Sequence, residues 1–336
     1  MEPDIQPKSE RQAVRDYQDR QAILPWTEKY RPRNLDEVMG QEEAVKSLKA
    51  FVKKKNMPNM LFSGPPGVGK TTCALALAHE LFGADISGNF LELNASDDRG
   101  IDIVRGRIKD FARSVSLGDA PFKLIFLDEG DALTSDAQQA LRRTMEANSS
   151  VTRFIISANY SSRIIEPIQS RCAVFRFMPL NAKEMHKALD HVAKGEKLKV
   201  DEQAFEAVFY VSEGDMRRAL NTMQGCAMHS EHITAELVHK TSSRAMPKEV
   251  KDMVGMAIAG KFLDARENLD KLIITYGLSG EDILYQVYRE IPKLEVPEKQ
   301  RMKLIEILGE YNFRMVQGAS ERIQLEAMLA QFAIAK

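Results

Sequence analysis

Hydrophobic and polar positions follow two different patterns along this 336-residue chain. Between about residue 22 and residue 177, helical patterns alternate with short apolar runs rich in β-branched and aromatic residues. This alternation predicts a parallel sheet covered by helices on both faces. Ligands bind at the carboxyl ends of the strands in such sheets, so the residues after these runs are candidates for chemistry. The expected strands are residues 59–63, 90–94, 123–128, 153–157 and 173–177.

From residue 178 onward, strand signals disappear and amphipathic helical patterns continue to the end of the chain. A break near Pro247 divides this helical region in two. The pattern therefore predicts four parts, which are an N-terminal tail, an α/β domain, a small helical domain and a longer helical domain, over residues 1–21, 22–177, 178–242 and 243–336.

The composition excludes several classes of protein. No apolar run approaches the roughly 20 residues of a membrane span, and the polar start shows no signal peptide, so we expect a soluble protein without a membrane partner. Cys73, Cys172 and Cys226 form no CxxC pair, which argues against a disulfide framework or a zinc module and favours the cytoplasm, or the nucleus of a eukaryote. The net charge of -1 excludes a globally basic nucleic-acid binder, so any nucleic acid would meet a local positive patch.

A phosphate-binding motif lies between one expected strand and the helical pattern after it. The stretch GPPGVGKTT fills every fixed position of G-x-x-x-x-G-K-[ST]. Its glycines let backbone N–H groups turn toward phosphate oxygens, while Lys70 would reach the β and γ phosphates and Thr71 would hold Mg²⁺. The predicted ATP contacts in this loop are Gly64, Pro65, Pro66, Gly67, Val68, Gly69, Lys70, Thr71 and Thr72.

An acidic motif follows the expected strand at 123–128. Its apolar residues deliver Asp128 to the edge of the sheet, where the carboxylate would bind Mg²⁺. Glu129 could then polarise the water that attacks the γ-phosphate. Taken alone, the acidic motif could also be a strand that runs into a solvated loop. Together with the phosphate-binding motif, it predicts a Mg²⁺-dependent ATPase.

Four further stretches, at residues 25–45, 93–105, 155–172 and 214–225, resemble boxes of the replication factor C small subunits, which are clamp-loader AAA+ ATPases. The resemblance implies an AAA+ core followed by a helical lid and a helical collar. It also implies a heteropentamer with a large subunit and other small subunits, which opens a sliding clamp and threads primer-template DNA through it without sequence specificity. Bacterial loader subunits are less similar, because they usually carry a zinc module that this sequence lacks.

The resemblance assigns roles to individual residues. Asn159 is similar to the first sensor, which orients the attacking water, and Arg217 to the second sensor, which reaches the triphosphate from the lid. Arg171 resembles the arginine finger that acts in trans on the ATP of a neighbouring subunit. Without the resemblance, each would be an ordinary turn or surface residue. The segment at 25–45 would fold over the adenine, with contacts from Tyr30, Arg31 and Val38.

One position departs from the family's pattern. The acidic motif of the family usually reads Asp-Glu-Ala-Asp, whereas this chain has Gly130 in the third place. Glycine lacks the Cβ that alanine packs, and we expect it to loosen the backbone just after Glu129. Metal binding and the role of Glu129 should survive.

A DNA-binding helix is predicted just after Asp97 and Asp98, which suit a helix N-terminus. Its apolar positions form a core face at Ile101, Val104, Ile108, Phe111 and Val115. Arg105, Lys109 and Arg113 form a positive stripe beside it, which could be a solvated face; the resemblance favours contact with DNA phosphates instead. The predicted DNA contacts are Arg99, Arg105, Arg107, Lys109 and Arg142, which Arg143 could join. Residues 108–117 are the candidate clamp contact, although Phe111 and Leu117 could equally be core.

Two other functions remain open from the sequence. The chain could be a scaffold subunit that binds ATP with little turnover, although a purely architectural subunit need not keep both the acid and the finger. A helicase would need a second strand-rich lobe where this sequence has helical patterns.

Overall fold

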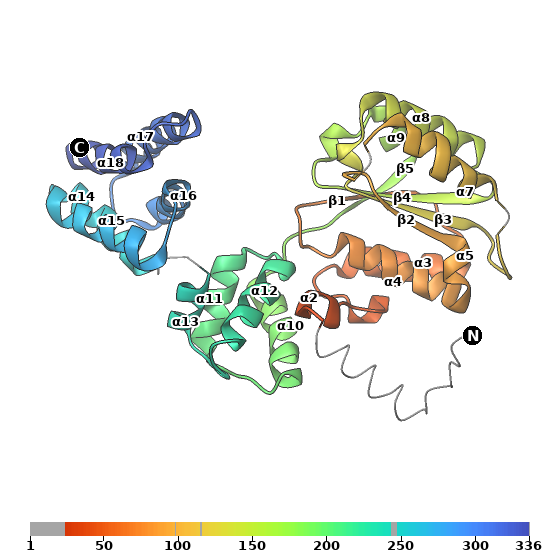
Figure 1. The fold of residues 1–336 in the computed structure, drawn as a ribbon, viewed down its shortest axis with the longest axis horizontal. Coiled ribbons are helices and arrows are strands. Elements are labelled where there is room, and N and C mark those ends of the chain that lie inside the picture. The colour runs from red at the N-terminus through yellow and green to blue at the C-terminus, as the bar shows by residue number, and fades with distance from the viewer. Residues whose placement is uncertain (1–23, 98, 115, 243–246, 336) are drawn as a thin grey trace, which may run out of the picture. The chain divides into compact units, whose positions relative to one another are not determined.

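A computed structural model describes residues 24–97, 99–114, 116–242 and 247–335 (Figure 1). The predicted tail, Asp98 and Val115 lie outside these described residues. Contacts divide the chain into two compact units. The first unit contains the residues up to Lys197 together with Ser212–Gln224, and the second contains Leu198–Val211 and the residues from Gly225 onward.

The first unit contains a five-stranded sheet in which all neighbouring strands are parallel, in the order β2-β3-β4-β1-β5. Each strand matches its predicted range to within one residue at either end, so the predicted α/β sheet is confirmed. The strands are β1 (Asn59–Ser63), β2 (Phe90–Asn94), β3 (Lys123–Asp128), β4 (Thr152–Ala158) and β5 (Cys172–Arg176).

Alternate residues of the strands enter two separate hydrophobic cores, as the pleat of a sheet requires. Phe62 of β1 and Phe126 of β3 pack with α3 (Glu42–Lys54) and α4 (Lys70–Phe82) on one face. Ile125 and Phe154 pack on the other face with the helical segment 101–113 and with α8 (Ser135–Ala147). Figure 1 shows these two helical layers with the sheet between them. The layers leave the carboxyl ends of the strands free to carry loops.

The helical segment 101–113 consists of α6 (Ile101–Ile103), a π-helical turn at Val104–Ile108 and α7 (Lys109–Arg113). The sequence predicts a regular helix with Ile101 and Phe111 in the core, and this is wrong in detail because both are only partly buried. The wider π-helical turn shifts the inward face by a residue. The fully buried positions are Ile103, Val104, Ile108 and Ala112.

The remaining elements of the first unit are the N-terminal strap, short connections, the helix α10 and the beginning of α12. A strap at residues 25–39 contains α2 (Trp26–Lys29) and η1 (Leu35–Glu37), and it is anchored by the buried side chains of Trp26 and Leu35. The others are η2 (Gly83–Asp85), α5 (Ile86–Asn89), η4 (Gly130–Ala132), η5 (Ser161–Arg163), α9 (Glu166–Gln169), α10 (Ala182–Gly195) and the beginning of α12 (Met216–Ala227).

The second unit is almost entirely helical. The described residues include one parallel pair of two-residue strands, β6 (Lys199–Val200) and β7 (His232–Ile233), where the sequence predicts no strand. A two-residue strand is too short to show alternation, which explains the error. The helices are α11 (Glu202–Ser212), α13 (Ala235–Thr241), α14 (Pro247–Ile258), α15 (Phe262–Tyr276), α16 (Gly280–Glu290) with η6 (Ile291–Lys293), α17 (Glu298–Val316) and α18 (Glu321–Ile334).

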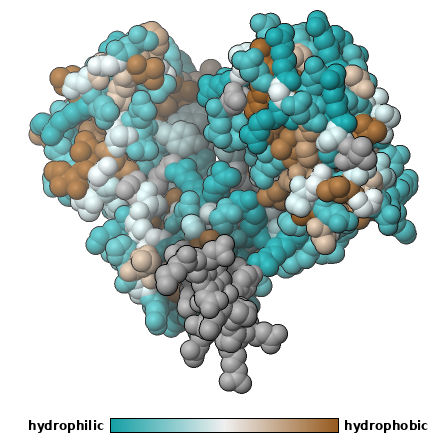
Figure 2. Space-filling model, turned by 45° about the vertical axis from the view of Figure 1, so that its right-hand side comes forward, coloured by the Kyte–Doolittle hydropathy of each residue, from teal (hydrophilic) through white to brown (hydrophobic). Residues whose placement is uncertain are grey.

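One hydrophobic core joins α14 to α18, with buried members such as Leu269, Ile283 and Phe332. The predicted boundaries at 178 and 243 stay predictions. Residues 243–246 lie outside the described part of the chain. Figure 2 shows a surface on which hydrophilic residues predominate and hydrophobic ones form scattered patches. Among the described residues, every helix is too short or too polar to traverse a lipid bilayer.

Candidate active site

The loop at residues 64–69 connects β1 to α4 and is held close to its neighbours at two glycines. A Cβ on Gly64 would lie 2.2 Å from the carbonyl oxygen of Phe177, just after β5. Gly67 has a φ of +71°, and a Cβ there would lie 1.8 Å from Oδ1 of Asp215. Both positions therefore require glycine, one for space and the other for space and backbone angle.

Lys70 is the first residue of α4, and the residue as a whole is buried. It donates to the carbonyl oxygens of Gly64 (2.7 Å) and Pro65 (2.8 Å) and to Oδ1 of Asn159 (2.9 Å). Burial lowers the pKa of Lys70, and the nearby carboxylates of Asp128 and Asp131 oppose that shift. The loop thus holds a cation among oxygen acceptors at the carboxyl ends of β1 and β4.

Thr71 lies beside the acidic motif. Its hydroxyl donates to Oδ2 of Asp128 at 2.6 Å, and Oδ1 of Asp128 accepts the backbone N–H of Glu129 at 2.9 Å. A hydroxyl oxygen and a carboxylate oxygen at this separation fit Mg²⁺, which prefers oxygen ligands and commonly takes one or two from the protein. Thr71 and Asp128 are therefore the candidate metal site. The described residues contain no cluster of three or more His, Cys, Asp or Glu that could hold a metal ion.

The turn after β3 presents two acids in different environments. Glu129 is exposed, with its backbone in the left-handed region at a φ of +52°. Gly130 is buried, and a Cβ there would lie 2.5 Å from Cγ2 of Ile156 on β4. Gly130 therefore packs tightly, because the turn approaches β4 closely at this position. The sequence predicted a looser backbone here, and the structure shows close packing instead.

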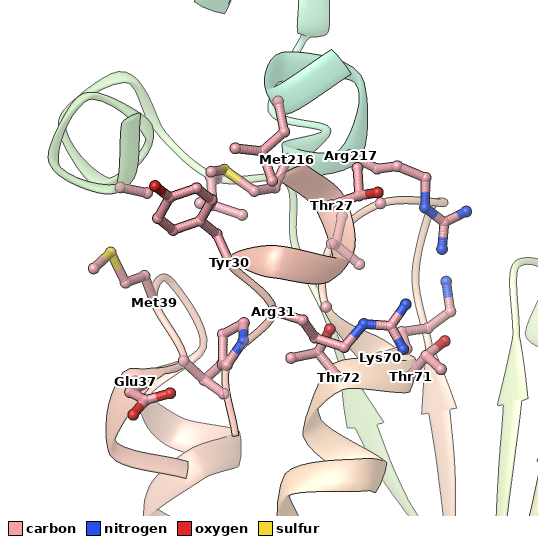
Figure 3. A pocket seen from close by; sticks show the side chains of 18 of the residues that line it. Thr27, Tyr30, Arg31, Glu37, Met39, Lys70, Thr71, Thr72, Met216 and Arg217 are labelled. Carbon is pink, nitrogen blue, oxygen red and sulfur yellow. The ribbon is translucent and has the colours of Figure 1, made fainter. Parts of the chain in front are cut away.

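A cavity of about 550 Å³ lies above the loop and is lined from the strap, the loop, the strand ends, α10 and α12. Figure 3 shows Tyr30, Arg31, Lys70, Thr71 and Arg217 projecting toward it. All predicted ATP contacts line it except Gly64 and Pro65, whose carbonyl groups instead hold Lys70. Asp128 and Glu129 also line it.

Apart from Arg217, sequence reasoning missed the residues that α10 and α12 contribute to the cavity, including Ala188, His191 and Leu220. Their amphipathic pattern indicates a buried face but does not say whether it covers a core or a ligand. The helix α12 is positioned by its first residues, because the N–H of Met216 donates to the carbonyl oxygen of Gly67 at 3.1 Å. This contact places Arg217 at the mouth of the loop.

The strap is fixed to the end of α10 by a shared carboxylate. Oε1 of Glu196 accepts from the hydroxyl of Tyr30 (2.7 Å) and from Nζ of Lys29 (2.6 Å). The ring of Tyr30 also makes an edge-on contact with His191, at 6.3 Å between centroids. Burial and the neighbouring Glu196 raise the pKa of Tyr30, so the phenol stays neutral. These contacts close one end of the cavity.

Arg171 does not line this cavity. Its guanidinium pairs with Oε1 of Glu146 at 2.5 Å and donates to the carbonyl oxygen of Pro167 at 2.7 Å. Arg142 pairs with the same Glu146 oxygen at 3.2 Å. The structure therefore places Arg142 beside Arg171, and Arg171 away from the ATP-binding loop of its own chain.

A groove of about 500 Å³ separates the segment 101–113 from α8. Of the predicted DNA contacts, Arg105 and Lys109 line it, whereas Arg99, Arg107 and Arg142 do not. Arg113 and Arg143 complete a set of four cations along the groove. Asp136 is the acidic residue among its lining. The predicted positive stripe thus faces a second row of side chains on α8.

Comparisons with known protein families match three successive parts of the chain. A model of the ATPase family associated with various cellular activities matches residues 60–180, and an RCF1/5-like AAA+ ATPase lid domain matches residues 187–228. A model of the replication factor C C-terminal domain matches residues 245–331. A replication factor C small subunit of Methanococcus vannielii is 56% identical over 92% of this chain and 98% of its own length.

The chain belongs to the replication factor C small subunit family. Further small subunits, from Archaeoglobus fulgidus and Sulfurisphaera tokodaii, are 53% and 50% identical over 91% and 92% of this chain, covering 96% and 95% of their own lengths. Membership in this family makes the chain an AAA+ ATPase component of a clamp loader. The AAA+ core, lid and helical C-terminal domain occur in the predicted order.

Solved structures show the same fold at greater distance. The Holliday junction branch migration motor RuvB of Thermotoga maritima aligns with a TM-score of 0.56 at 19% identity, over 80% of this chain and 99% of the motor. At this identity the likeness concerns the fold alone. It confirms the arrangement of the sheet and its flanking helices.

Proposed function

We propose that this chain binds ATP with Mg²⁺ in the cavity above the loop and hydrolyses it to load a sliding clamp onto primer-template DNA. The observation that carries this proposal is that two hydrogen-bonded pairs, Lys70 with Asn159 and Thr71 with Asp128, lie at the strand ends and line one cavity. Such a convergence of a lysine, a hydroxyl and a carboxylate is what phosphoryl transfer in this class of ATPases requires.

The residues of the cavity divide the work between binding and chemistry. Lys70 would exchange its carbonyl partners for phosphate oxygens, and Arg217 would approach the triphosphate from α12. Mg²⁺ held by Thr71 and Asp128 would neutralise charge on the β and γ phosphates. Glu129 would polarise the attacking water, which Asn159 would orient.

We assign Arg171 to the ATP of a neighbouring subunit. Its position outside its own cavity supports this role, because an arginine in trans must lie on a surface that another subunit can reach. The partners would be a replication factor C large subunit and further small subunits in a heteropentamer. The names of the relatives, which are all small subunits, support a complex with other chains.

The groove between 101–113 and α8 is the proposed DNA contact. Four cations there can neutralise phosphates without reading bases, which suits a protein that must act at any primer end. Because Arg99, Arg107 and Arg142 lie outside the groove, we expect them to contribute less to DNA binding than Arg105 and Lys109.

The variant Glu129→Gln tests whether the site of this chain hydrolyses ATP in the assembled complex. We expect ATP binding to persist and hydrolysis to fall by about 10² or more, because the amide cannot accept a proton from the attacking water. Glu43→Gln, an exposed acid on α3, is the matched control and should keep the wild-type rate. An unchanged rate in Glu129→Gln would favour the alternative, a scaffold subunit that binds ATP with little turnover.

A further inference from the structure

Asp131 makes contacts that neither the phosphate-binding loop nor the metal pair requires. It lies in η4, three residues after the metal-site carboxylate of Asp128. Its Oδ1 accepts the backbone N–H of Asn159 at 3.3 Å, and its Oδ2 accepts the backbone N–H of Tyr160 at 3.1 Å. One carboxylate thus holds two successive peptide groups in the turn after β4.

This arrangement is a strong way to fix a turn. Successive backbone N–H groups that point the same way form a concavity for an anion, and hydrogen bonds to a carboxylate are shorter and stronger than neutral ones. Asp131 is only partly buried, so it can form these bonds without the desolvation cost of a fully buried charge. Asp131 of the acidic motif therefore holds the turn that carries Asn159 in place.

The backbone of Asn159 determines where its side chain can reach. Oδ1 of Asn159 accepts from Nζ of Lys70 at 2.9 Å, so a continuous path runs from Asp131 through the Asn159 backbone to the ammonium group of Lys70. With the backbone fixed, only the two side-chain torsions of Asn159 remain free. A shift of the turn would move the amide away from Lys70.

The turn after β3 reaches β4 because Gly130 has no side chain. A Cβ at this position would lie 2.5 Å from Cγ2 of Ile156, three residues before Asn159. The turn is closed by the N–H of Ala132, which donates to the carbonyl oxygen of Glu129 at 2.8 Å. Gly130 thus brings Asp131 within reach of the turn after β4.

We infer that Asp131 is a positioning residue for ATP hydrolysis, which holds Asn159 in place beside Lys70 through the backbone of the turn after β4. This inference rests on the proposed function, because it assumes that Asn159 acts on bound ATP. Asp131 itself does not line the cavity. Its loss should therefore lower turnover while ATP still binds.

Steady-state hydrolysis by the assembled complex and ATP binding by the full chain test this inference together. For Asp131→Ala we expect kcat to fall about tenfold and the Kd for ATP to change less than about threefold. Asp131→Asn keeps one acceptor oxygen but places an NH₂ group against a backbone N–H, so its kcat should lie between those of the wild type and Asp131→Ala. Asp119→Asn, in the exposed turn before β3, controls for the loss of one negative charge.

A double-mutant cycle separates positioning from a general structural effect. If Asp131 acts through Asn159, adding Asp131→Ala to Asn159→Ala should lower kcat by no more than about twofold further. If the losses of kcat in the two single variants multiply in the double variant, the inference is overturned. A folded Asp131→Ala variant with wild-type kcat would also overturn it.

Amide hydrogen exchange gives a readout that does not need ATP hydrolysis. In Asp131→Ala the amides of Asn159 and Tyr160 should exchange at least about tenfold faster than in the wild type, while those of β4 should not change. Unchanged exchange at both amides would overturn the inference even if kcat falls. If the wild-type complex fails to hydrolyse ATP but exchange responds as expected, the proposed function fails and the contact itself is retained.

Discussion

The hydroxyl of Thr71 donates to the carboxylate of Asp128 across 2.6 Å, which joins the first turn of α4 to the end of β3. These two residues are 57 positions apart in the sequence, and the parallel sheet brings their strand ends to the same edge. The contact links the phosphate-binding loop to the acidic motif before any ligand is considered. It is the basis of the proposed metal site.

Replacement of Asp128 by Asn should weaken the binding of Mg²⁺ to a measurable extent. We expect the Mg²⁺ concentration for half-maximal ATP hydrolysis to rise about tenfold or more, because the amide has no charge for the cation. Thr71→Ser keeps the hydroxyl and should stay close to the wild type. A magnesium titration in which the two variants behave alike would contradict the assignment of Asp128.

Gly130→Ala should affect stability and turnover more than ATP affinity. The added methyl group would overlap Cγ2 of Ile156, and overpacking of this kind usually costs about 1–3 kcal/mol. We expect the Kd for ATP to stay within about threefold, because Gly130 does not line the cavity, and kcat to fall as Asp131 is displaced. Thermal unfolding, ATP titration and hydrolysis measure the three effects. A tenfold loss of ATP affinity would contradict this account.

Neutralising the groove should change how DNA binding depends on salt. The double variant Arg105→Ala/Lys109→Ala should flatten the plot of log K against log salt by about 1 to 2 units, since each phosphate contact contributes about 0.9. Lys53→Ala/Lys54→Ala, which removes two exposed lysines at the end of α3, should leave the slope unchanged. Equal slopes for both double variants would remove the groove from the DNA interface.

The contact between Tyr30 and Glu196 predicts a dependence of stability on pH. The pKa of Tyr30 is raised above its ordinary value of 10.0, chiefly by burial and then by Glu196. A raised pKa means that the stabilisation is complete below pH 10 and is lost as the pH rises through the higher pKa of the folded state. Thermal unfolding between pH 8 and about pH 11 should show a steeper loss in the wild type than in Tyr30→Phe. Parallel curves would contradict the raised pKa.

The sequence predicted the sheet well because its strands are nearly continuous apolar runs that end at polar residues, as at Asp128 and Asn159. It predicted the phosphate-binding loop because that motif needs glycine and lysine at fixed spacings. The π-helical turn at 104–108 escaped prediction, since one extra residue in a turn leaves no mark on the hydrophobic pattern.

The residues of the candidate site could be predicted only in part from the sequence, because several of them are brought together by tertiary contacts. Residues such as His191 and Leu220 belong to the cavity through the docking of α10 and α12, which depends on tertiary contacts and not on local pattern. Asp131 is the last residue of the acidic motif, but its partners are 28 and 29 residues away along the chain. The pairing of Arg171 with Glu146 on α8 likewise joins residues that are far apart in the sequence.

The central claim is that each ATP is bound by one subunit and that Arg171 of the next subunit completes the active site. Complementation between two inactive variants tests this claim most directly. Lys70→Ala and Arg171→Ala should each abolish most hydrolysis when every copy of this chain in the complex carries the change. In complexes assembled from an equal mixture, some interfaces would pair an intact loop with an intact arginine. We predict recovery toward about a quarter of the wild-type rate, the fraction expected for random pairing at equivalent interfaces. No recovery in mixed complexes that assemble normally would contradict action in trans.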